Sequence, residues 1–200
     1  MARTRAQDYA EKRGSILHQA AQLFAQHGYT GTSISMIAAA NGVSKALLYH
    51  YYPDKEAVLF DILHTHLTAL VACVDVAAAS AAPGTPQLLA IGEALLEAYR
   101  GAHAAHQVQI ANLRLLPESR QTELRALERK LVARASGAIS DIIPGIAGTP
   151  ALKPLTMAWF GMINWHYLWF QEGRGISRAD YARMVSQLIS TGGAEAIKPF

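Results

Sequence analysis

A short stretch in the first quarter of the sequence carries side chains that suit contacts with nucleic acid. Residues 44–50, SKALLYH, have helical spacing, and Ser44 is an N-cap whose side-chain oxygen accepts a backbone N–H of the first turn. Leu48 and Leu47 are expected to pack inward. The polar side chains donate hydrogen bonds, which suits phosphate oxygens and base edges better than an apolar core. These donors are Lys45, Tyr49 and His50.

Residues 32–55 predict the two short helices that position these donors. Thr32 or Ser33 caps the first helix, and Asn41-Gly42 ends it, because Gly42 supplies the positive φ of a tight turn. Two short helices joined by about three or four residues that include Gly match the helix-turn-helix unit. In that unit the second helix enters the major groove of DNA. An αα-hairpin that docks another protein has the same pattern, so that alternative stays open.

The predicted contacts with DNA are of two kinds. Side chains of the second helix face the bases, and residues at helix starts hold phosphates, since the first turn of a helix attracts anions. Pro53-Asp54-Lys55 begins the next helix and places Lys55 at such a start. The full set predicted to contact DNA is Thr32, Ser33, Ser44, Lys45, Ala46, Tyr49, His50 and Lys55.

Three motifs fall between about Ile16 and Phe60: L-F-x-x-x-G-Y, S-K-A-L-L-Y-H-Y-Y and P-D-K-E-A-V-L. With these motifs the region resembles the DNA-binding domain of TetR/AcrR-type transcriptional regulators. The resemblance implies a three-helix DNA-binding domain, followed by a helical domain for ligand binding and dimerisation. One departure is that many members carry Gly-Thr or Gly-Ser after the Ser-Lys pair, where this chain has Ala46-Leu47.

The apolar pattern predicts an all-α fold of about nine helices. A helix-turn-helix DNA-binding domain is expected over residues 1–52, with residues 1–7, which include Arg3 and Arg5, as a flexible arm. Residues 53–200 are expected to form the C-terminal helical ligand-binding and dimerisation domain.

A long helix is expected from Pro53 or Asp54 to near Ala79, where apolar residues keep helical spacing throughout. It is long enough to belong to both domains, so we expect it to transmit a change from one to the other. The other helices outside the helix-turn-helix are expected at about 8–27, 86–102, 106–116, 118–142 and 155–170, and from Ser177 onward.

All three tryptophans of the chain fall between Leu155 and Phe170. The predicted helix is apolar nearly all round and must be buried on more than one side. The core of a single domain could bury it, but we expect the regulatory core on one face and a partner subunit on the other. Gly161 is expected to allow close approach of a neighbouring helix. The resemblance implies that the last two helices pair in a dimer. Its predicted interface residues are Trp165, Trp169, Tyr181, Val185 and Leu188.

A second resemblance concerns the ligand. The sequence F-G-M-I-N-W-H-Y-L-W-F is similar to the corresponding helix of family members that sense acyl-CoA thioesters, and the recognition region resembles regulators of aromatic-acid catabolism. This implies a repressor whose inducer is an acyl-CoA or aryl-acyl-CoA. For Arg114, the one arginine among the candidate pocket residues, a role in surface solubility stays open. The candidate pocket residues are Leu67, Leu70, His103, His106, Arg114, Trp159, Met162, Ile163 and His166.

Composition narrows the remaining function classes. The chain has 51% hydrophobic and only 16% charged residues, which favours extra surface buried against a partner, and its net charge of +3 permits nucleic-acid binding. The single cysteine, Cys73, cannot form an intrachain disulfide and fits a cytoplasmic location. The charged start predicts no secretory signal, and no apolar run is expected to reach the length needed to cross a bilayer.

Catalytic motifs are missing from the sequence. It has no glycine-rich phosphate loop, no nucleophile elbow and no ligand-spaced Cys, His or acidic cluster, so no enzyme activity, cofactor or metal is expected. The expected function is a sequence-specific DNA-binding regulator, a homodimer on a palindromic operator. It would act mainly as a repressor that a small molecule relieves. The alternative is an all-helical dimeric interaction protein that uses its helix-turn-helix for protein docking.

Overall fold

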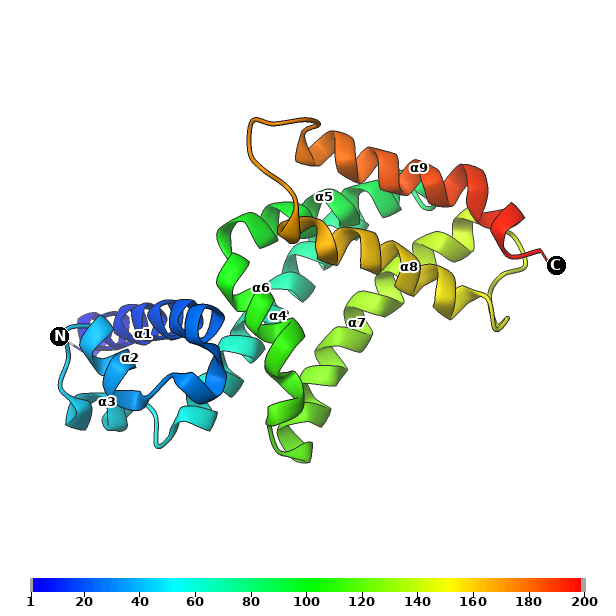
Figure 1. Cartoon of the computed structure of the whole chain (residues 1–200). Coiled ribbons are helices and arrows are strands. Elements are labelled where there is room, and N and C mark those ends of the chain that lie inside the picture. The colour runs from blue at the N-terminus through cyan, green and yellow to red at the C-terminus, as the bar shows by residue number, and fades with distance from the viewer. Residues whose placement is uncertain (1, 199–200) are drawn as a thin grey trace. The chain divides into compact units, whose positions relative to one another are not determined.

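The computed structural model describes residues 2–198, with side chains from residue 7 onward. This part of the chain holds nine α-helices and two 3-10 turns and has no strand, which confirms the predicted all-α class (Figure 1). The α-helices are α1 (Ala2–Gly31), α2 (Ile34–Ala40), α3 (Lys45–Tyr51), α4 (Lys55–Ser80), α5 (Thr85–Gly101), α6 (His103–Asn112), α7 (Glu118–Ile142), α8 (Leu152–Trp165) and α9 (Arg178–Ala196), and the 3-10 turns are η1 (Leu113–Leu115) and η2 (His166–Leu168).

The chain packs as two compact units. Unit 1 comprises Met1–Leu67 and Ala102–Arg125, and unit 2 comprises Thr68–Gly101 and Ala126–Phe200. Helices α4 and α7 therefore contribute residues to both units. This division describes packing, whereas the predicted boundary after residue 52 concerns function and stays a prediction.

The first helix of unit 1 supports the two short helices that follow it. Helix α1 packs against α2 and α6, and it buries Ile16 and Phe24 of its predicted apolar stripe. Gly28 has a φ of 73° and interrupts α1 where the sequence predicts its end, so the last residues form a separate short turn. The predicted flexible arm coincides with the start of α1, and residue 1 and the side chains of residues 2–6 lie outside the described part.

Unit 2 is built around helices α5, α8 and α9, which pack against one another; α8 and α9 lie side by side in Figure 1. Trp159 is completely buried among them. The close approach occurs at Gly92 of α5, where an added Cβ would lie 3.4 Å from Cζ2 of Trp159. Within the described chain, no neighbour lies within 4 Å of a Cβ built at Gly161, so a close approach there to a partner subunit stays a prediction.

Two predicted boundaries of α8 shift in the structure. The helix begins at Leu152, inside the predicted connection, because Pro154 lies in its first turn, where a missing N–H costs nothing. It ends at Trp165 and continues as the 3-10 turn η2, whereas the sequence predicted one helix to residue 170.

Helix α4 is long and apolar enough to span a membrane by length and composition alone, with a mean hydropathy of 1.8 over its most apolar window. The prediction that no apolar run reaches this length is therefore wrong. Half of that window is buried inside the protein, and the core helix of a water-soluble protein passes the same test.

Candidate nucleic-acid interface

The caps of the two short helices form as the sequence predicts. Ser33 caps α2, since its Oγ accepts the N–H of Met36 at 3.2 Å. Ser44 caps α3 in the same way, and its Oγ accepts the N–H of Leu47 at 3.1 Å. Gly42 has a φ of 62° in the turn between them. These contacts fix the direction in which α3 leaves the turn.

Helix α3 presents its polar side chains to solvent. Leu48 is completely buried and anchors the helix, which confirms one half of the predicted inward pair. The other half is wrong, because 42% of Leu47 is exposed. Tyr49 is 46% exposed, and the Lys45 ammonium lies 5.9 Å from the centre of its ring. The exposed residues of this helix are Lys45, Ala46, Leu47, Tyr49 and His50.

Thr32 is buried and serves the fold. Its hydroxyl lies 2.9 Å from the carbonyl oxygen of Gly28 and 3.1 Å from that of Leu23, and it donates to these two acceptors. The predicted phosphate contact through this side chain is contradicted, because the hydroxyl is used inside unit 1. Its physical role is to hold the chain after the interruption of α1 against the helix body.

Lys55 also makes internal contacts. Its Nζ donates to the carbonyl oxygens of Tyr29 at 2.7 Å and Thr32 at 2.8 Å, and it lies 4.3 Å from the centre of the Tyr29 ring. Two of its three N–H donors are therefore already engaged. The sequence predicted a phosphate contact because Lys55 is placed at a helix start. The structure instead directs its ammonium to carbonyl oxygens near the end of α1 and just after it.

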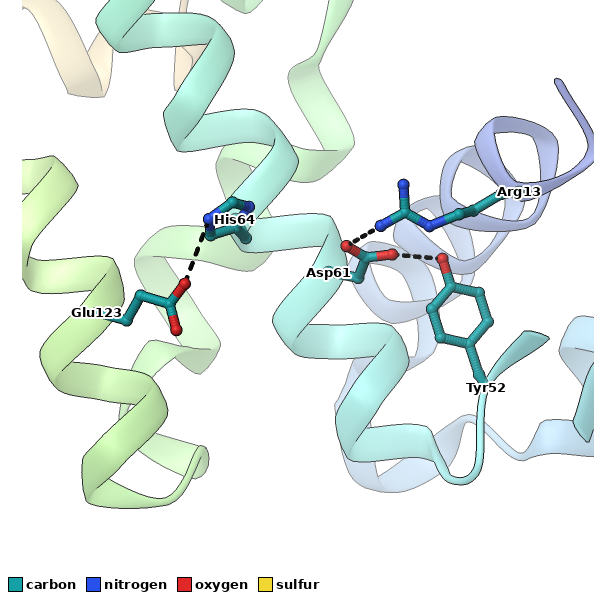
Figure 2. A network of polar contacts seen from close by, with 5 residues as sticks. All are labelled: Arg13, Tyr52, Asp61, His64 and Glu123. Atoms are coloured by element: carbon teal, nitrogen blue, oxygen red, sulfur yellow. Dashed lines mark hydrogen bonds and ion pairs between the residues drawn. The ribbon is translucent and has the colours of Figure 1, made fainter. Parts of the chain in front are cut away.

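Figure 2 shows a carboxylate that joins three segments of unit 1. Asp61 of α4 accepts a hydrogen bond from Arg13 of α1 at 2.6 Å through Oδ1 and from the Tyr52 hydroxyl at 2.5 Å through Oδ2. Burial, and then the hydrogen bond to Asp61, raise the pKa of Tyr52 well above its ordinary value. Tyr52 directly follows α3, so the contact ties the end of that helix to α4.

Further contacts fix the other faces of the helix-turn-helix. The rings of Tyr9 in α1 and Tyr51 in α3 stack with their centres 4.7 Å apart. Asn41, in the turn, receives hydrogen bonds from Lys12 on its carbonyl oxygen and from Ser15 on its side-chain oxygen. No sequence motif predicted these positioning residues or the carboxylate of Asp61. A lone acid in an otherwise apolar stretch of α4 was the available signal.

The predicted dimer residues separate into two groups. Tyr181 and Val185 are buried inside unit 2, and the Tyr181 hydroxyl donates to the carbonyl oxygen of Met162. Their predicted place at a partner surface is therefore contradicted, since α9 turns them toward its own unit. Exposed apolar side chains do occur on α8, α9 and the segment between them. They are Met157, Trp165, Leu168, Trp169, Ile176, Met184 and Leu188.

The candidate pocket residues are divided between the two units. In unit 1, His106 is buried with its ring centre 5.8 Å from that of His66, whereas His103 and Arg114 are exposed. Burial, followed by the proximity of His106, lowers the pKa of His66 to about 3. Unit 1 therefore buries two neighbouring imidazoles, and the lowered pKa favours the neutral form of His66.

The candidates of unit 2 mostly belong to its core. Trp159 and Ile163 are fully buried, as is nearly all of Leu70. His166 is buried as well, and it stacks on Phe170 with ring centres 4.2 Å apart. Burial, and then the charge of Arg178, lower the pKa of His166 to about 4. The described residues contain no group of three His, Cys, Asp or Glu side chains that could hold a metal.

Comparisons with known proteins identify the family. The model described as "Bacterial regulatory proteins, tetR family" matches residues 16–62, and "Tetracyclin repressor-like, C-terminal domain" matches residues 81–193. A TetR-family transcriptional regulator from Bordetella parapertussis 12822 is 34% identical, with 94% of this chain and 98% of that chain covered and a TM-score of 0.84. AibR, solved with isovaleryl coenzyme A and operator DNA, is 26% identical, with 90% and 98% covered and a TM-score of 0.77.

Curated relatives match over a shorter region. The regulator RutR of Escherichia coli (strain K12) is 39% identical over 59 residues, which is 30% of this chain and 28% of RutR. MftR of Mycobacterium tuberculosis, a putative regulator of mycofactocin biosynthesis by its description, is 39% identical over 28% of each chain. The match therefore spans less than a third of either relative. Two family models and a full-length structural relative lead to one conclusion: the chain belongs to the TetR family of bacterial transcriptional regulators.

Proposed function

We propose that the protein is a homodimeric repressor that binds a palindromic operator and releases it when a small molecule binds. The observation that carries this proposal is helix α3, which buries Leu48 and exposes Lys45, Tyr49 and His50. Hydrogen-bond donors on the outer face of a recognition helix suit base edges and phosphate oxygens.

The proposed DNA contacts follow from which groups remain available. The Oγ atoms of Ser33 and Ser44 accept backbone N–H groups, so each hydroxyl still has a proton to donate to a phosphate. Lys45, Ala46, Tyr49 and His50 are proposed to face the groove. Lys55 and Thr32 act one step away, because their hydrogen bonds hold the protein segments that carry these groups.

The proposed dimer uses the exposed apolar surface of α8, α9 and the segment between them. An exposed surface with two tryptophans, Trp165 and Trp169, and with Leu188 of α9 suits a partner of the same kind. A two-fold dimer reads a palindrome when its recognition helices are about 34–36 Å apart, one turn of DNA. Trp165, Trp169 and Leu188 are the proposed interface residues, with Met157 and Met184 added from their exposure.

The proposed inducer is an acyl-CoA or aryl-acyl-CoA thioester. AibR, whose structure contains isovaleryl coenzyme A, supports this class. Linkage requires the ligand to prefer a conformation with weaker DNA affinity, with a coupling of about 1–3 kcal/mol. We propose α4 as the transmitter, because Asp61 holds the helix-turn-helix and the same helix continues into unit 2. The protein would act in the cytoplasm and carry out no catalysis.

The direct test is selection of a binding site from random DNA, followed by fluorescence anisotropy with the selected duplex at two salt concentrations. We expect tight binding with a steep salt dependence, because phosphate contacts release counterions. A panel of CoA thioesters is then added to the complex. Release by one thioester supports the full proposal, and binding that no thioester affects removes the inducer class alone.

The control for this test is an exposed lysine outside the helix-turn-helix. Lys45→Ala is expected to weaken binding, whereas Lys130→Ala on α7 is expected to leave it unchanged. If no sequence is enriched, the DNA-binding proposal fails and protein docking becomes the better explanation of the helix-turn-helix.

A further inference from the structure

Leu47 is an exposed apolar side chain among the groups proposed to contact DNA. It is 42% exposed, whereas the adjacent Leu48 is fully buried. Its backbone N–H donates to the Oγ of Ser44 at 3.1 Å, so its position in the first turn of α3 is fixed. The fold therefore holds this leucine firmly and leaves much of its side chain in water.

The direction of Leu47 follows from helix geometry. Successive residues are rotated by about 100° around an α-helix. With Leu48 pointing inward, Leu47 and Tyr49 lie on opposite flanks of the outer surface. The Tyr49 flank is polar, because the Lys45 ammonium lies over that ring at 5.9 Å. Helix α3 thus has one polar flank and one apolar flank.

The chemistry of a leucine restricts what it can recognise. Leucine has no hydrogen-bond donor or acceptor, so it cannot bind a phosphate oxygen or the polar groups of a base. In the major groove the bases present one apolar group, the C5-methyl of thymine. An aliphatic side chain of this size covers a methyl group and gains from removing it from water.

We propose that Leu47 is a specificity-determining residue that packs against the C5-methyl of a thymine in each half of the operator. This inference rests on the proposed DNA-binding function and specifies which base that function reads. A single exposed leucine is common on protein surfaces. Leu47, however, is exposed on the same helix as Lys45, Ala46 and Tyr49, which are proposed to face the DNA groove. The partner proposed for this leucine is therefore a base.

The experiment replaces thymine with deoxyuracil, one position at a time, in the duplex selected for the full-length protein. This change removes the C5-methyl and keeps every hydrogen-bonding group of the base. We expect one thymine position of the half-site to be sensitive. Replacing that thymine in one half-site should lower the affinity about four-fold, and replacing it in both half-sites about fifteen-fold, because each replacement removes one buried methyl group. A thymine outside the binding site is the control position.

The protein variants then assign the methyl to its partner. In Leu47→Ala, the sensitive position should lose its dependence on the methyl, whereas Leu47→Met should retain most of it. Leu115→Ala is the matched control, since this leucine is 54% exposed in the 3-10 turn η1 of the same unit. It should leave both the affinity and the methyl dependence unchanged.

Three results would overturn the inference while the DNA-binding function stands. The first is a set of selected operators whose common half-site sequence contains no thymine. The second is equal affinity for the thymine and deoxyuracil duplexes. The third is a methyl dependence that Leu47→Ala leaves intact, which would give the contact to another residue. Failure to enrich any duplex would overturn the proposed function and the inference with it.

Discussion

The helix-turn-helix of unit 1 and the helices of unit 2 are held in place by different forces. Helix α3 has only seven residues and buries only Leu48, so apolar burial stabilises it little. Directional contacts therefore supply the remaining stabilisation. Asp61 and Lys55 provide such contacts to the neighbouring segments. In unit 2, α5, α8 and α9 pack through large apolar side chains around Trp159.

This difference follows from helix length and has a consequence for function. A short helix removes little apolar surface from water, and each buried CH₂ contributes only about 0.8 kcal/mol. Hydrogen bonds also have strict angular requirements, so they fix the orientation of a recognition helix. Apolar packing has no direction of its own, and helices held by it can shift when a ligand binds.

Truncation of the central tryptophan should give the largest effect. We expect Trp159→Ala to lower the free energy of unfolding by about 3–5 kcal/mol, because it leaves a large cavity in unit 2. Urea unfolding at one fixed protein concentration measures this loss. Trp165→Ala is the matched control: 53% of this side chain is exposed, so its loss should be much smaller and should appear in the dimerisation equilibrium. Equal losses in the two variants would contradict the assignment of Trp159 to the core.

Loss of one charge should loosen the helix-turn-helix. Asp61→Asn weakens the hydrogen bonds from Arg13 and Tyr52, and we expect it to destabilise unit 1 by about 2 kcal/mol. Protection of α3 amides from hydrogen exchange is the appropriate measurement. Asp75→Asn, which alters an exposed pair with Arg134 in unit 2, is the control and should have little effect. Unchanged protection in Asp61→Asn would show that apolar packing alone holds α3.

Two lysines of unit 1 separate a structural from a direct role in DNA binding. Lys55→Ala should destabilise the protein by about 1.5 kcal/mol, since it removes two hydrogen bonds to carbonyl oxygens. Lys45→Ala should leave stability unchanged and lower the slope of log affinity against log salt by about one. Thermal unfolding and salt titrations of operator binding test the pair. If Lys55→Ala has normal stability and a reduced salt slope, Lys55 contacts a phosphate directly, and its structural role is refuted.

The buried imidazole of His166 in unit 2 should lower the stability of the protein in acid and have no effect on it at neutral pH. The pKa of His166 is lowered from 6.5 to about 4, so below pH 6.5 the unfolded chain binds a proton that the folded chain does not. Stability should therefore fall as the pH decreases from 6.5 toward 4. His166→Phe retains a ring that can stack on Phe170, beside Tyr181, and should reduce this fall. An identical pH dependence in the variant would exclude His166 as its source.

Local features of the sequence determined the secondary structure of the DNA-binding region. Ser33 and Ser44 are caps, and Gly42 is a turn residue, because each acts on atoms within four residues of itself. The same locality explains why the helix-turn-helix and the family could be predicted from the sequence. It also explains the all-α class, since apolar spacing reports the period of a helix directly.

Tertiary structure decided which side chains remain available for function. Thr32 and Lys55 looked like phosphate ligands, but carbonyl groups of α1 and the turn after it satisfy them. Leu47 was predicted to pack inward but is exposed, and Val185 was predicted to lie at a partner surface but is buried. These outcomes depend on which neighbouring helix meets each face, and a pattern of one helix carries no information about its neighbours.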